Sequence, residues 1–187
     1  GDESVLVMVY GRQSQICIRD RSNHNQININ IKFYLFSFDR IFVVVINKKH
    51  SRFLKEIKSN TFSKIIGGKT RQESTYKALR YIKKNRIKCT NVLIHDSARP
   101  NFSLKLIKRI INASKRNAVI PKIPMHDALK ESIGKKILLN LPRKNFFSTQ
   151  TPQSFNFKEI LNLHSDKKNL YKGNRYRNYH FNRLNWL

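Results

Sequence analysis

The sequence predicts an α/β fold in which a parallel β-sheet lies between layers of helices. Short β-branched runs, of which IFVVVI at residues 41–46 is the clearest, alternate along the chain with segments of amphipathic helical spacing. Glycine and polar motifs directly follow the predicted strands, as ligand-binding loops do in open α/β sheets. The chain has 187 residues, of which 40% are apolar, and this is enough for one domain with a core.

The individual elements follow from two periodicities. The β-branched run at residues 41–46 predicts a strand that is buried on both faces, and residues 91–94 predict another buried strand. Residues 64–66 and 118–123 are predicted as further strands. Apolar residues spaced three and four apart predict helices at residues 51–59, 74–84, 103–114 and 155–163. Ser103 stands where a helix N-cap is expected.

Residues 125–148 depart from this rhythm. Gly134 and two lysines separate the apolar run at 129–133 from a second run at 137–139. A glycine turn between two such runs is typical of a β-hairpin. We therefore expect this segment to form a projecting arm.

The two ends of the chain fit the pattern poorly. The stretch CIRDRS at residues 17–22 resembles a translated sequencing adapter, although an ordinary unusual amino terminus is the alternative. After residue 165 the periodicity fades into a basic, aromatic tail that reads as if the frame had shifted. We expect residues 1–32 to be non-native or disordered, residues 33–165 to form an incomplete domain, and residues 166–187 to be irregular.

The net charge of +27 comes from 38 Lys and Arg against 11 Asp and Glu. Such an excess favours nucleic-acid binding through counterion release. AT-rich codon usage is the alternative, because Lys, Asn, Ile, Tyr and Phe are all abundant and the basic residues are spread along the chain. We expect nucleic acid not to be the partner.

Cysteine usage and hydropathy indicate a cytoplasmic protein. Cys17 and Cys89 form no CxxC motif, which argues against a disulfide scaffold or a zinc site. The apolar run at 41–46 is far shorter than the roughly 20 residues of a membrane helix. Residues 1–16 lack the basic start of a signal peptide, so we expect no membrane association.

Three segments are candidate binding sites. Gly67, Gly68 and Lys69 precede a predicted helix, where glycines permit close approach to a flat ligand and free N–H groups favour anions; a plain turn, with Ser74 near the cap, is the alternative. Asp96 and Arg99 follow the strand at 91–94 and are suited to sugar hydroxyls, a metal and phosphate, or else form a local surface pair beside a satisfied His95.

The third candidate segment is TQTPQSF at residues 149–155, which places hydroxyl and amide groups before a helix. A simple helix entry capped by Thr151 or Ser154 is the alternative.

In combination the motifs are more specific than any one of them. GGxxRxxS, HDxARP, PxxDxLK (residues 124–130) and QTPQxF follow one another in this order. This arrangement resembles the 2-C-methyl-D-erythritol 4-phosphate cytidylyltransferase family of the non-mevalonate isoprenoid pathway, over residues 41–165. The resemblance implies a three-layer, Rossmann-like nucleotidyltransferase sheet with a projecting β-arm. It also implies transfer of a cytidylyl group from CTP to methylerythritol phosphate with Mg²⁺, in a homodimer held by the arm.

The resemblance further implies site residues. Gly67, Gly68, Lys69 and Ser74 would hold the cytosine, and Asp96 would lie near the ribose or substrate hydroxyls and the metal. The same comparison gives Arg99 a role in supporting that loop or the phosphates, Thr151 a contact with methylerythritol phosphate, and Arg143 a contact with the substrate phosphate of the partner subunit's site. Asp96, Arg99 and Arg143 are thus the expected catalytic residues.

The sequence also departs from the family pattern. Residues 1–40 contain no glycine-rich triphosphate loop, since Gly11-Arg12 is an isolated pair. Ala128 replaces the arm threonine, and the closing acidic and lysine motifs are absent. We therefore expect this chain to have little or no activity, because the leaving pyrophosphate needs a cradle of N–H groups and a cation. The alternatives are another sugar nucleotidyltransferase and a basic nucleic-acid-binding module; the chain could also be part of a bifunctional enzyme that carries a cyclodiphosphate synthase.

Overall fold

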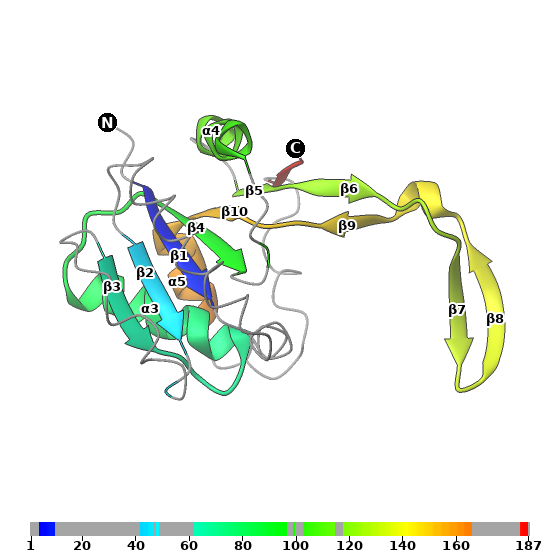
Figure 1. Cartoon of the computed structure of the whole chain (residues 1–187), viewed down its shortest axis with the longest axis horizontal. Coiled ribbons are helices and arrows are strands. Elements are labelled where there is room, and N and C mark those ends of the chain that lie inside the picture. The colour runs from blue at the N-terminus through cyan, green and yellow to red at the C-terminus, as the bar shows by residue number, and fades with distance from the viewer. Residues whose placement is uncertain are drawn as a thin grey trace, which may run out of the picture.

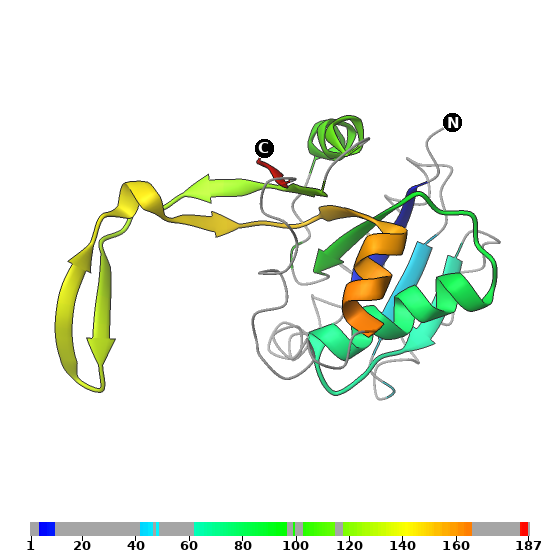
Figure 2. The same ribbon diagram turned by 180° about the vertical axis from the view of Figure 1, so that it is seen from behind.

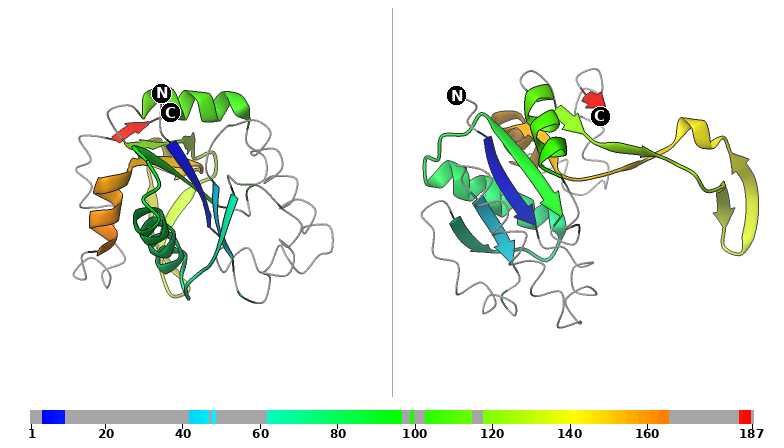
Figure 3. Two further views of the ribbon diagram at one scale, coloured as in Figure 1. Left: turned by 90° about the vertical axis from the view of Figure 1, so that its left-hand side faces the viewer. Right: turned by 45° about the horizontal axis from the view of Figure 1, so that its top comes forward.

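The computed structural model describes residues 4–9, 42–46, 48, 62–96, 99, 103–114, 118–165 and 184–186. Its centre is a seven-stranded sheet with the order β11-β5-β10-β4-β1-β2-β3 (Figure 1). Helices α3 (Arg71–Lys84) and α5 (Phe157–Ser165) cover one face, as Figure 2 shows, and α4 (Leu104–Ala113) lies toward the other side in Figure 3. The predicted layered α/β class is confirmed.

The four strands that form the parallel half of the sheet are β1 (Ser4–Val9), β2 (Phe42–Ile46), β3 (Phe62–Ile66) and β4 (Asn91–Asp96). All their pairings are parallel, so their carboxyl ends meet at one edge. Val43 to Ile46 of β2 are buried, as their β-branched composition predicts, and Asn91 to His95 of β4 are buried as well. The helix expected at residues 51–59 lies outside the described residues.

Strand β1 corrects the expectation that the chain has no ordered element before residue 33. Ser4–Val9 pairs with β2 on one side and β4 on the other, and Val5 and Val7 belong to the core. Its sequence SVLVMV is a short apolar run of the kind that forms a buried strand, and the unusual composition around it concealed this signal. The non-native origin of residues 1–22 stays a prediction.

The segment from Gln153 to Asn156 corrects a second expectation. It forms strand β10, which runs antiparallel between β4 and β5 (Ala118–Ile120), and α5 begins only at Phe157. The helix was predicted from residue 155. Asn156 begins it instead, because its Oδ1 accepts from the N–H of Glu159 at 3.2 Å.

The carboxyl-terminal tail also contributes to the sheet. Strand β11 (Leu184–Trp186) pairs in parallel with β5 at the edge of the sheet, within the stretch expected to be irregular. That prediction is therefore wrong for these three residues. The division of the chain into three parts stays a prediction.

The remaining helices follow their sequence signals closely. Helix α3 begins three residues before the predicted residue 74, because Thr70 is the N-cap and its Oγ1 accepts from the N–H of Glu73 at 3.1 Å. Helix α4 has the expected N-cap, Ser103, whose Oγ accepts from the N–H of Leu106 at 3.2 Å. Within the described residues, no helix combines the length and the apolar character needed to cross a membrane.

The predicted arm is present and extends away from the sheet (Figures 1 and 3). Its stem is formed by β6 (Lys122–Pro124) and β9 (Phe147–Thr149), and its tip is the hairpin of β7 (Leu129–Ile133) and β8 (Lys136–Leu141). Gly134 turns the hairpin with φ of 58°, a conformation that favours glycine. The strand predicted over 118–123 divides at Pro121 into β5 and β6, since β5 stays in the main sheet while β6 enters the arm.

Candidate active site

The candidate site lies at the carboxyl edge of the parallel strands. Gly67 and Gly68 follow β3, and Asp96 ends β4. Because β3, β2, β1 and β4 are parallel neighbours, both motifs lie at the same edge, which confirms the sequence prediction. Three strand spacings separate them, or about 14 Å, a span that suits a nucleotide.

Close packing against the first turn of α3 explains the two glycines. A Cβ on Gly67 would lie 2.8 Å from Ser74 Oγ and 3.1 Å from Val45 Cγ1, and a Cβ on Gly68 would lie 2.3 Å from Glu73 Cδ. Neither position has room for a side chain unless a neighbour moves. Glycine at these positions therefore allows close packing of the segment against helix α3, and its contact with a ligand stays a prediction.

Helix α3 also supplies the polar groups that hold this glycine segment. The N–H of Gly68 donates to Ser74 Oγ at 3.0 Å, and the N–H of Lys69 donates to Glu73 Oε2 at 2.8 Å. Ser74 is only 1% exposed, and because its oxygen accepts from Gly68, its proton is the part of the hydroxyl that can be donated.

Lys77, one turn further along α3, also holds the glycine segment in place. Its ammonium group donates to the carbonyl of Gly67 at 3.0 Å and lies 3.7 Å from the Glu73 carboxylate. Sequence reasoning missed both Glu73 and Lys77. Their spacing of four residues on a helix that begins beside a glycine pair was the available signal.

The segment after strand β4, which carries Asp96 and Arg99, is hydrogen-bonded to the segment that carries Gln150 and Thr151. The N–H of Asp96 donates to Thr151 Oγ1 at 3.3 Å, and Arg99 Nη1 donates to Gln150 Oε1. Gln150 is fixed in turn, because its N–H donates to the carbonyl of Pro121 at 2.8 Å and its Nε2 donates to Ser148 Oγ at 3.1 Å. Sequence reasoning predicted the Asp96, Arg99 and Thr151 positions but not the contact between the motifs.

His95 is the buried centre of this network. Its Nε2 lies 2.9 Å from the carbonyl oxygen of Arg99, and its Nδ1 lies 3.1 Å from Thr151 Oγ1. The side chain has no exposed surface, and burial lowers the pKa of His95 from 6.5 to about 4. His95 is therefore neutral near pH 7, and the view of it as a satisfied polar residue is confirmed.

Arg143 lies away from these groups within one chain. It begins the short helix η2 (Arg143–Asn145) at the bend of the arm, beyond the stem (Figure 1). Its Nη1 donates to the carbonyl of His126 at 2.8 Å, which holds the arginine against the chain entering the hairpin. A single chain thus does not bring Arg143 to Asp96.

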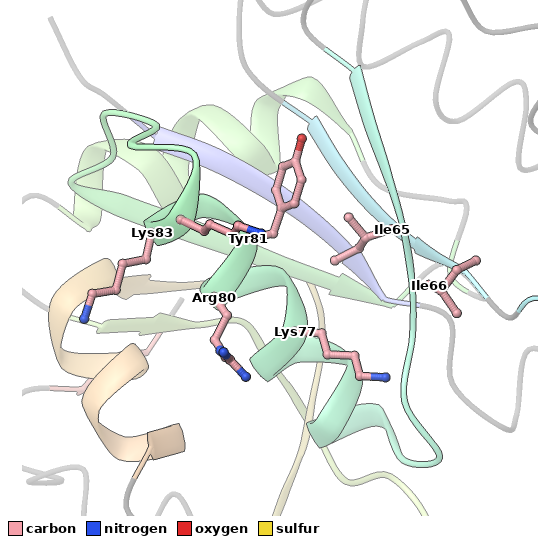
Figure 4. Close-up of a pocket in the computed structure, with 7 residues that line it drawn as sticks. Ile65, Ile66, Lys77, Arg80, Tyr81 and Lys83 are labelled. Atoms are coloured by element: carbon pink, nitrogen blue, oxygen red, sulfur yellow. The ribbon is translucent and has the colours of Figure 1, made fainter.

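A separate hollow of about 690 Å³ lies between the edge strand β3 and helix α3. Figure 4 shows it with Ile65, Ile66, Tyr81 and the basic residues of α3. Lys77, Arg80 and Lys83 point in different directions there, so they do not form a common site for one ligand.

The described part of the chain contains no group of three or more His, Cys, Asp or Glu side chains able to hold a metal ion by themselves. Asp96, half-buried at the end of β4, offers a single carboxylate. This arrangement fits Mg²⁺, which is commonly bound through one or two carboxylates together with substrate phosphates and water.

A parallel sheet with a glycine segment and an acidic strand end at one edge defines the class of α/β nucleotide-binding folds. Within that class, the profile of the family described as IspD, 2-C-methyl-D-erythritol 4-phosphate cytidylyltransferase, matches residues 30–175. The chain belongs to this family, as the four sequence motifs indicated.

Individual relatives agree with this assignment. The chain is 47% identical over 131 residues to the bifunctional enzyme IspD/IspF of Pelagibacter ubique, a match that covers 70% of this chain and 34% of the relative. It is 33% identical over 132 residues to the 2-C-methyl-D-erythritol 4-phosphate cytidylyltransferase of Thermosipho melanesiensis, covering 68% and 58%. The chain therefore spans about a third of the bifunctional relative and somewhat over half of the single-function one.

Solved structures show the same fold. The 4-diphosphocytidyl-2C-methyl-D-erythritol synthase of Anaerococcus prevotii superposes with a TM-score of 0.74 at 22% identity, over 98% of this chain and 85% of that one. The 2-C-methyl-D-erythritol 4-phosphate cytidylyltransferase of Thermus thermophilus gives 0.69 at 22% identity, over 100% and 88%. At this level of identity the likeness supports the fold, and the named relatives support the family.

Proposed function

We propose that the chain carries the cytidylyl-transfer site of its family, with CTP and 2-C-methyl-D-erythritol 4-phosphate as substrates and the diphosphocytidyl ester and pyrophosphate as products, and that its turnover is low because residues 1–40 contain no glycine-rich triphosphate loop. The observation that carries the proposal is the meeting of the glycine segment and Asp96 at one sheet edge. Residues 33–165 would form the nucleotidyltransferase domain, and the cytoplasm would be its location.

Recognition of the base would fall to the glycine segment. Cytosine differs from uracil by its N4 amino group, which donates hydrogen bonds. The carbonyl groups of Gly68 and Lys69 would accept from this amino group, while the carbonyl of Gly67 already accepts from Lys77. The Ser74 hydroxyl, whose oxygen accepts from the Gly68 N–H, would donate its proton to an acceptor of the ring. Glu73 and Lys77 would keep this segment in the shape that favours cytosine.

The reacting groups would meet beside Asp96. Its carboxylate would hold ribose or substrate hydroxyls and one side of a bound Mg²⁺, which supplies charge neutralisation for the phosphates when present. Arg99, fixed by Gln150, would support the segment that follows Asp96, and Thr151 would contact methylerythritol phosphate. The contribution of these residues is positioning and electrostatic stabilisation of in-line attack on the α-phosphorus.

The arm would join two copies of the chain. Its outer strand β8 exposes three consecutive large apolar side chains, of which Leu138 is 51% exposed, and Ile133 on β7 is 71% exposed. An apolar surface of this kind on a projecting hairpin favours burial against a partner. Arg143 would then reach the phosphate of methylerythritol phosphate in the partner's site, and not in its own.

Ligand-dependent thermal stabilisation tests the proposal directly. With Mg²⁺, CTP should raise the unfolding temperature more than UTP or ATP, because binding to the native state alone adds stability. Ser74→Ala should remove the preference for CTP, whereas Ser132→Ala, an exposed hydroxyl on the arm, is the matched control. Equal stabilisation by all three nucleotides, or binding of mixed-sequence polynucleotide that disappears with salt, would count against a cytidylyltransferase site.

A further inference from the structure

The hydroxyl of Thr151 lies between two groups whose hydrogen-bonding roles can be assigned. A carbonyl oxygen only accepts, so the 2.9 Å contact between His95 Nε2 and the carbonyl of Arg99 requires the proton to be on Nε2. In a neutral imidazole Nδ1 is then an acceptor, and the Thr151 hydroxyl must donate to it across 3.1 Å.

The second partner of Thr151 fixes the other side of the hydroxyl. The N–H of Asp96 can only donate, and it donates to Thr151 Oγ1 at 3.3 Å. The Thr151 hydroxyl therefore donates its single proton to His95 Nδ1 and accepts, through one lone pair, from the N–H of Asp96. Only one lone pair is left for a ligand, and a lone pair accepts from a hydroxyl but repels an ionised phosphate oxygen.

We propose that His95 is a positioning residue that fixes Thr151 as a hydrogen-bond acceptor toward the ligand, so that Thr151 binds a polyol hydroxyl and not a phosphate oxygen. This inference rests on the proposed function, and it specifies which part of methylerythritol phosphate Thr151 meets. The phosphate is left to cationic groups such as Arg143.

The same contacts extend the role of His95 to its neighbours. Its Nε2–H holds the carbonyl of Arg99, while Arg99 itself reaches Gln150, the residue before Thr151. His95 thus couples the segment that carries Asp96 to the segment that carries Thr151. The imidazole is completely buried, and burial disfavours its charged form, as this arrangement of donors and acceptors requires.

The first test reads the tautomer in the protein without ligand. Two-dimensional ¹H–¹⁵N NMR of the histidine side chains at pH 7 should show Nε2 protonated and Nδ1 bare for His95. Assignment uses His95→Gln, which retains a donor but cannot supply the Nδ1 acceptor. A protonated Nδ1 would overturn the polarity argument, whatever the function of the chain.

The second test compares two ligands on the same variants. Methylerythritol 4-phosphate and inorganic phosphate are titrated calorimetrically in the presence of Mg²⁺ and α,β-methylene CTP. Thr151→Val and His95→Gln should each weaken methylerythritol 4-phosphate about fivefold, the effect of one neutral hydrogen bond, and leave inorganic phosphate unchanged. Thr151→Ser should restore wild-type affinity, and His164→Gln, a buried histidine on α5 stacked on Tyr76, is the matched control.

The outcomes distinguish failure of the inference about Thr151 from failure of the proposed function. Equal weakening of both ligands would show that Thr151 contacts phosphate, and unchanged affinities in variants that fold normally would show that the network has only a structural role; either result overturns the inference. If the wild-type chain binds neither CTP nor methylerythritol 4-phosphate, the proposed function fails and the choice of a polyol fails with it.

Discussion

Acidification should destabilise this protein through His95 in a defined pH range. Burial lowers the pKa of His95 from 6.5 to about 4, against smaller opposing effects of the Arg99 carbonyl and the Asp96 charge. Below pH 6.5 the unfolded chain takes up a proton that the folded chain refuses. Stability is therefore fully present above pH 6.5 and falls as the pH approaches 4.

The size of this effect follows from the two pKa values. Each pH unit between them corresponds to about 1.4 kcal/mol, so the full loss of unfolding free energy is about 3 kcal/mol. This value is an appreciable fraction of the 5–15 kcal/mol that roughly bounds the stability of a typical domain.

Urea unfolding at several pH values between 7 and 4 measures the loss. Other groups titrate over the same range, so the quantity to compare is the difference in unfolding free energy between the wild type and His95→Gln. Between pH 7 and pH 4, the unfolding free energy of the wild type should fall by about 3 kcal/mol more than that of His95→Gln. Parallel stability curves for the two proteins would refute the reasoning, and His164→Gln serves as the control for replacing a buried imidazole.

Three further predictions concern the glycine segment and the arm. Gly67→Ala should lower the unfolding free energy by about 1–3 kcal/mol in urea, because its Cβ meets the buried Ser74 and Val45. Gly68→Ala should cost at least as much, because its Cβ would lie 2.6 Å from Glu73 Cβ, and rotation of the Glu73 side chain cannot relieve that contact; a smaller loss than for Gly67→Ala would contradict this. Leu138→Asp should convert a dimer to a monomer in sedimentation without lowering the unfolding midpoint, and a wild-type monomer would disprove the arm interface. Arg143→Ala should weaken methylerythritol 4-phosphate about tenfold or more in calorimetry but not CTP, as expected for a lost charged contact to phosphate.

The parts of the fold that sequence predicted share a strong local signal. The β-branched run of β2, the amphipathic spacing of α4 with Ser103 before it, and the glycine turn at residue 134 each identify their element without reference to the rest of the chain. Strand β10 has no such signal. QSFN is short and mostly polar, and it becomes a strand only because β4 and β5 offer edges on both sides.

Strand β1 was not predicted although its sequence carries a local signal. Its apolar run was present in the sequence, but the composition of the surrounding residues suggested that the segment did not belong to the protein. Pairing on both sides and burial of Val5 and Val7 are tertiary properties, and they depend on β2 and β4, which follow much later in the chain. A short apolar run is compatible with a buried strand wherever it occurs.

The candidate site was predicted as separate motifs, and its assembly depends on the register of β10. Gln153 pairs with Ile94 in an antiparallel ladder, so stepping back two residues on one strand and forward two on the other places Thr151 opposite Asp96. This pairing explains why residues 55 positions apart share a hydrogen bond. A slip of one residue would place Gln150 or Pro152 there and remove the hydroxyl from His95. The proposed role of Thr151 as an acceptor toward the ligand therefore depends on the register of β10 against β4. The tautomer of His95 tests both the register and this role.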